Sequence, residues 1–102
     1  MGKIELDTND PLVRIQKQLF ANVKDMVLNE NAVSIDVRER KPDGGERKIV
    51  FIINCAENEA KKIVGKAGLT IMALRRLASG TAKKLNIPFP VEVEVFDELL
   101  GD

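Results

Sequence analysis

Two glycines three residues apart are the feature of this sequence with the clearest chemical use. Residues 65–68 read Gly-Lys-Ala-Gly and lie between an apolar helical pattern that ends at Val64 and another that begins near Thr70. Because glycine has no Cβ, a turn of this kind lets a phosphodiester chain approach the peptide N–H groups of the backbone. Those groups lie at the positive end of the following helix dipole, and Lys66 adds a cation. The segment therefore predicts a site for phosphate groups.

The rest of the sequence offers little material for catalysis. It contains no histidine and a single cysteine, Cys55. Ser-His-Asp and Cys-His catalysis, His-containing metal sites and thiolate zinc sites therefore have no residues to build them. The carboxylates stand beside lysines and arginines, as they do on solvated surfaces. We expect a protein that is not an enzyme, with no catalytic residues, no metal site and no cofactor.

Length and composition indicate one globular domain. A chain of 102 residues can bury about 65% of the surface of its unfolded form. No apolar run approaches the ~20 residues that span a bilayer, and no segment resembles a signal peptide. The lone cysteine agrees with a reducing compartment. We expect a single domain over residues 1–102, with its core at about residues 10–96, an acidic C-terminal tail, a cytoplasmic location and no membrane association.

The formal net charge of zero conceals an uneven distribution. Residues 55–85 carry seven Lys or Arg and two Glu, whereas residues 86–102 carry five acidic residues and no basic one. Opposite charges in neighbouring segments thus cancel. The basic segment is the one that contains the two glycines.

The first half of the sequence predicts a helix followed by a hairpin. Asp10-Pro11 is a typical helix start, and apolar residues recur at helical spacing from Leu12 until the pattern stops around residues 28–31. Residues 33–38 alternate between apolar and polar, as in a strand with one buried face. A polar turn at residues 41–46 leads to a second strand at residues 48–53, whose unbroken apolar run indicates a central position.

The second half predicts two helices and a last strand. Asn54 and Glu57 have the spacing of a capping box, so we expect a helix over about residues 55–64 that ends at Gly65. A further helix opens near Leu69 and continues to about Leu85, with Gly80 allowing a close helix contact. Residues 91–95 alternate as a strand. A two-helix crossover between strands normally makes them parallel. The fold class is therefore α+β, in the order α-β-β-α-α-β, with a three-stranded mixed sheet and three helices on one face.

This order, with Gly-x-x-Gly between the second and third helices, resembles the type II (prokaryotic) KH domain. Residues 60–75 are similar to the family's pattern V-I-G-K-x-G-x-T-I-x-A-L-R, and the likeness extends from about Pro11 to Val95. It is closest to the small single-KH bacterial RNA-binding proteins of the KhpA type. The loop of a KH domain clamps about four nucleotides of single-stranded nucleic acid. The resemblance thus implies RNA binding by Val64, Gly65, Lys66, Ala67, Gly68, Thr70, Ile71 and Arg75.

Some of these residues also have ordinary structural interpretations. The glycines could form only a tight turn with an exposed lysine, and the helical spacing of Ile71 and Leu74 is typical of core residues. Arg75, Arg76, Lys83 and Lys84 could extend a track for the backbone or form a solvated helix face. Leu69 departs from the family, which often has a basic residue there. The scarcity of aromatic residues disfavours broad base stacking.

Two classes of function follow from the resemblance. The first is a single-stranded RNA-binding protein that acts as an RNA chaperone or post-transcriptional regulator, with ribosome assembly as a variant. The second is a protein-interaction module that forms a homodimer or a heterodimer with another KH protein. The Gly-Lys-Ala-Gly loop favours the first, whereas the zero net charge and Leu69 favour the second. The two functions can coexist, because a dimer of two RNA-binding domains would bind RNA with greater avidity than one domain.

Overall fold

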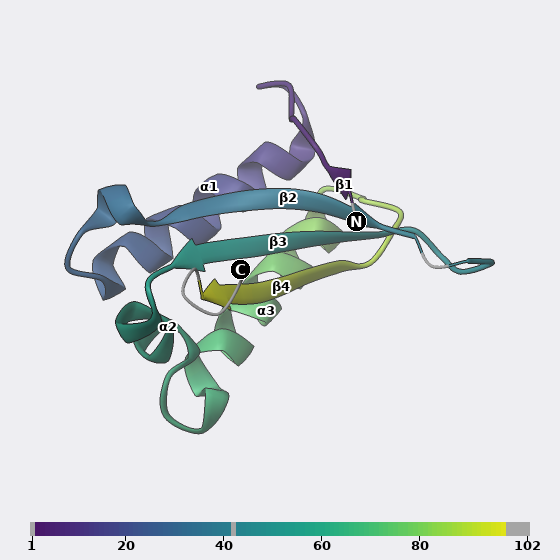
Figure 1. The fold of residues 1–102 in the computed structure, drawn as a ribbon. Helices are drawn as coiled ribbons and strands as arrows, with labels where there is room; N and C mark the ends of the chain where they lie inside the picture. The colour runs from purple at the N-terminus through teal and green to yellow at the C-terminus, as the bar shows by residue number, and fades with distance from the viewer. Residues whose placement is uncertain (1, 42, 98–102) are drawn as a thin grey trace.

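The computed structural model describes residues 2–41 and 43–97 and shows two layers, a mixed sheet and a layer of helices (Figure 1). The sheet has the order β1-β2-β3-β4. All three α-helices lie on the same side of it, and no helix of the described residues covers the other side. The predicted arrangement of helices on one face is confirmed.

Strand pairing agrees with the predicted topology. β2 (Ser34–Arg40) pairs antiparallel with β3 (Lys48–Cys55). β4 (Val91–Asp97) pairs parallel with β3, in a register that places Val93 opposite Phe51. The crossover through two helices therefore gives the expected parallel pair. The α-β-β-α-α-β order and the type II KH fold class are confirmed.

A short strand that the sequence did not predict extends the sheet. β1 (Gly2–Lys3) pairs antiparallel with β2 at the edge opposite to β4, with Gly2 opposite Glu39. Two residues carry no alternation pattern, so this strand had no signal in the sequence. Pro42 in the hairpin turn and residues 98–102, which hold most of the predicted acidic tail, lie outside the described residues.

The helices begin and end close to the predicted positions. α1 (Pro11–Val23) starts as expected, with the Asp10 carboxylate accepting from the Leu12 N–H at 2.9 Å. It ends before the apolar pattern does, and two single 3₁₀ turns follow, η1 (Lys24–Met26) and η2 (Glu30–Ala32). α2 (Glu57–Val64) and α3 (Leu69–Lys84) flank the glycine-rich turn.

Two predicted details of these helices are wrong. Asn54 does not cap α2: it belongs to β3, and its side-chain amide donates to Ser34 Oγ at 3.2 Å. The buried strand continues through Cys55, so the helix starts later, at an Ala56 N-cap without a side-chain bond. Gly80 is exposed, and a Cβ there would meet nothing within 4 Å, so no close helix contact requires it.

The core fills the space between the helices and the sheet. Every second residue of β3 points inward, and Ile49, Phe51 and Ile53 are fully buried there against Ile15 and Leu19 of α1. α3 contributes the buried Ile71 and Leu74, as their helical spacing indicated, together with Ala78. This layer fixes the positions of α2 and α3, and with them the turn between the two helices.

Candidate nucleic-acid interface

The turn between α2 and α3 has an unusual backbone. Gly65, Ala67 and Gly68 all have positive φ, at 78°, 54° and 73°. Residues Lys66–Gly68 form a single 3₁₀ turn, η3, inside this bend. The positive φ of Ala67 costs about 1–2 kcal/mol relative to a right-handed conformation. The chain thus holds a strained turn at the tip that joins the two helices, at the bottom of the molecule in Figure 1.

Gly65 is required by space as well as by conformation. A Cβ at this position would collide with Thr70 Oγ1 and would lie 3.0 Å from the Thr70 backbone nitrogen. At Gly68 the nearest atom to a Cβ would be Ile71 Cγ2 at 4.0 Å, so that glycine is needed for its φ alone. The half-buried Thr70 therefore packs directly against the loop and fixes its shape, which the sequence pattern did not reveal.

The hydrogen bonds that close the turn leave part of its backbone unused. The N–H of Gly65 donates to the Lys61 carbonyl at 2.9 Å, and that of Gly68 donates to the Gly65 carbonyl at 3.2 Å. The Leu69 N–H donates to the Lys66 carbonyl. The N–H groups of Lys66 and Ala67 take no part in these closing bonds. They are the donors that this turn can offer to an anion.

The electrostatics of the turn also suit an anion. α3 begins at Gly68 without a side-chain cap, and its first turn holds no acidic residue. Within the described residues, no capping side chain and no acid of its own first turn therefore offsets the positive end of its dipole. Lys66 is exposed and forms no ion pair with a described residue. Backbone donors, a helix N-terminus and a mobile cation thus meet at one place.

Three exposed apolar side chains flank the turn in the sequence. Val64 is 36% exposed, Leu69 65% and Met72 43%. Ile71, by contrast, is only 5% exposed and packs in the core with Leu74. Of the predicted binding residues, the structure brings Val64, residues 65–68 and Thr70 together at the turn. Ile71 lies beneath them and supports the turn from the core.

Arg75 lies apart from the turn. Its Nε donates to the Val93 carbonyl at 3.1 Å, which ties α3 to the open edge of β4. It lines a hollow of about 370 Å³ together with Arg40 and residues of β4, including Glu92 and Glu94. The sequence did not place these two glutamates here, because the Val-Glu alternation shows that they share a face but not what the face adjoins.

Two further properties of the described residues bear on the class of site. No group of three or more His, Cys, Asp or Glu side chains is arranged to hold a metal ion in residues 2–41 and 43–97. Across the same ranges, every helix is too short or too polar to pass through a lipid bilayer.

Comparison with known proteins gives a likeness of fold. No protein-family model and no curated protein sequence matches the chain. Among solved structures, it is similar to the crystal structure of Era in complex with MgGDPNP and nucleotides 1506–1542 of 16S ribosomal RNA, with a TM-score of 0.59 and 12% sequence identity. The match covers 97% of this chain and 37% of the Era chain. This chain thus spans just over a third of the length of that neighbour.

Proposed function

We propose that this protein binds single-stranded RNA and that the Gly-x-x-Gly loop (residues 65–68) clamps the phosphate backbone. The observation that carries the proposal is the loop itself. Its positive-φ backbone leaves the Lys66 and Ala67 N–H groups out of the closing hydrogen bonds, beside an uncapped helix N-terminus. The KH fold agrees, and the neighbour Era was crystallised with nucleotides of 16S ribosomal RNA.

The apolar side chains around the loop suit the bases of such an RNA. Val64 precedes the loop in the sequence, Leu69 and Met72 follow it, and all three are exposed. A base whose phosphate is held by the loop can rest on these side chains without a charged partner. Leu69 then adds apolar contact where a basic residue would have added a phosphate contact. We therefore expect Leu69 to contribute nothing to the salt dependence of RNA affinity.

We propose that the protein acts as an RNA chaperone or post-transcriptional regulator, similar to the KhpA type. A role in ribosome assembly is a variant of this function. A single small domain reads few nucleotides. Such a protein would act on many RNAs with modest affinity, and it would need no catalytic residue or cofactor. We place this function in the cytoplasm.

A protein-interaction module is the second candidate. The exposure of Leu69 and Met72 on adjacent turns of α3 favours it, because such apolar side chains often mark contact surfaces. The partner would be a second copy or another KH protein. Sedimentation at tens of micromolar tests this, since a strict monomer that captures no KH protein would remove the second candidate.

The test of RNA binding uses two aspartates in the loop. K66D/A67D places negative charges where the phosphates would lie, and Asp tolerates the positive φ of residue 67 better than most residues. The control K41D/G45D makes the same change of charge in the hairpin turn, where both residues are exposed.

We expect K66D/A67D to bind a short single-stranded RNA at least tenfold more weakly than wild type, whereas K41D/G45D should bind it like wild type. The unfolding free energies should stay within about 0.5 kcal/mol of wild type. Equal RNA affinity in a folded K66D/A67D variant would reduce the loop to a structural turn.

A further inference from the structure

The two longest helices carry charges of one sign only. α1 and α3 contain no Asp or Glu over 13 and 16 residues. Their basic residues are all exposed. None of them forms an ion pair with a described carboxylate. Five of them, leaving aside Arg75 at the β4 edge, are called here the basic helical face: Arg14, Lys17, Arg76, Lys83 and Lys84.

The placement of these charges differs from that of an ordinary solvated helix. α2 shows the ordinary pattern, with Glu57 and Glu59 in its first turn, Lys61 and Lys62 in its last turn, and an ion pair between Lys62 and Glu59 at 3.3 Å. That pattern complements the helix dipole. α1 has no acidic residue in its first turn and carries Arg14 near its positive end. Lys83 and Lys84 do complement the α3 dipole, but Arg14, Lys17 and Arg76 are not explained in this way.

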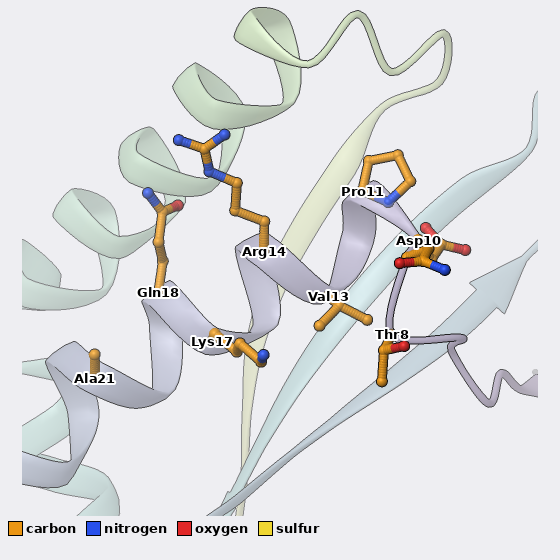
Figure 2. Close-up of a pocket in the computed structure, with 9 residues that line it drawn as sticks. Thr8, Asp10, Pro11, Val13, Arg14, Lys17, Gln18 and Ala21 are labelled. Carbon is orange, nitrogen blue, oxygen red and sulfur yellow. The ribbon is translucent and has the colours of Figure 1, made fainter.

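The two helices present these charges together. Thr81 Oγ1 of α3 donates to Gln18 Oε1 of α1 at 2.7 Å, which fixes one helix against the other. Figure 2 shows Arg14 and Gln18 extending from the side of α1 that faces α3, with Lys17 on the outer side. A groove of about 570 Å³ along α1 is lined by these three residues and by Asp10, Pro11 and Ala21, among others. On α3, Arg76 and Lys83 are seven residues apart and so share one side of the helix.

The basic helical face begins where the RNA site ends. α3 starts at the Gly-x-x-Gly loop and runs for 16 residues, or about 24 Å, alongside α1. Beyond Met72, the described part of α3 has no exposed large apolar residue, and neither has α1. A membrane surface would call for such residues to insert, and most protein partners would contact them. A phosphate chain requires only the charges.

We propose that the basic helical face is a second contact surface for RNA, which holds the backbone of the segment continuing from the loop. This inference rests on the proposed function. The loop grips a few nucleotides, while Arg76 and Lys83 guide the strand along α3 to Arg14 and Lys17. The protein would thus bind a long RNA more tightly than a short one, although its net charge is zero.

The test compares RNAs of two lengths. R14Q/K17Q and R76Q/K83Q each remove two charges from the face, and the control K41Q/K48Q removes two from the hairpin turn and the start of β3. We expect each face variant to bind a five-nucleotide RNA within about twofold of wild type. For a single strand of about 20 nucleotides, affinity should drop about tenfold, and the salt dependence should fall by about 0.7 in slope for each lost phosphate contact.

The outcomes separate this inference from the proposed function. If K66D/A67D loses the five-nucleotide RNA while both face variants bind the long RNA like K41Q/K48Q, the basic helical face is not an RNA surface and the loop function stands. If K66D/A67D still binds the short RNA normally, it is the proposed function that fails. Wild-type protein that binds both lengths equally well would also overturn the inference. So would face variants that lose binding to phosphatidylserine vesicles but keep the long RNA, since the face would then serve a membrane.

Discussion

The open face of the sheet and the basic helical face both carry cations, but the surroundings of these cations differ. On the sheet, Arg40 reaches from β2 across β3 to Glu94 and Glu92 of β4, at 2.9 and 3.6 Å. Lys48 lies 3.9 Å from Glu92, and Arg38 lies 4.0 Å from Asp36. Each of these cations is therefore near a carboxylate, whereas the five cations of the basic helical face form no ion pair with a described residue.

The reason lies in what the sheet charges cover. Val50 and Ile52 of β3 point away from the helices, yet they are only 0% and 9% exposed. The register places Val50 beside Arg38 and Glu92, and Ile52 beside Asp36 and Glu94. The alkyl parts of such side chains can shield apolar residues while their charged ends stay in water. Paired charges thus cover apolar residues on one face, whereas on the other face the cations form no ion pair with a described residue.

The largest effect on the helical side should come from Gly65→Ala. The new Cβ would collide with Thr70 Oγ1 at a φ of 78°, so we expect a loss of about 2–4 kcal/mol in the free energy of unfolding together with weaker RNA binding. Gly68→Ala is the matched control, because its Cβ has room and only the φ is unfavourable, at about 1–2 kcal/mol. Urea unfolding measures both. Equal losses in the two variants would show that the contact with Thr70 does not shape the loop.

A smaller effect is expected from the sheet side. R40Q/E94Q removes the shortest ion pair between β2 and β4 without changing the net charge. Both side chains are 42% exposed, so the free energy of unfolding should fall by less than about 1 kcal/mol, and less at high salt. RNA affinity should not change. A marked change in RNA affinity would contradict the division of roles between the two faces.

The sequence predicted the architecture well because the relevant signals are local. Alternation over residues 33–38 and 91–95, the apolar run of β3 and the Asp10-Pro11 start each act within a few residues, and the crossover rule supplied the parallel pair. The capping-box spacing at Asn54 competed with an apolar run that continues to Cys55, and burial in the sheet decided the outcome. Local patterns do not rank such competing signals.

The candidate site was only partly predictable, because its decisive features are three-dimensional. The glycines identified the turn, but the positive φ of Ala67 cannot be read from an alanine, and the packing of Thr70 on Gly65 depends on how the two helices meet. The bond from Arg75 to Val93 joins residues that are 18 positions apart. The one-sided charge of α1 and α3 was visible in the sequence, but its meaning depends on the two helices lying side by side.

The central claim, that RNA lies on the Gly-x-x-Gly loop, can be tested most directly by NMR titration of the ¹⁵N-labelled protein with a five-nucleotide single-stranded RNA. The account predicts that the largest amide shifts occur at residues 64–70, above all at the Lys66 and Ala67 N–H groups that take no part in the closing bonds. Residues of the open sheet face, such as Arg38 and Ile52, should shift little. Shifts centred on that face, with the loop amides unchanged, would contradict the account.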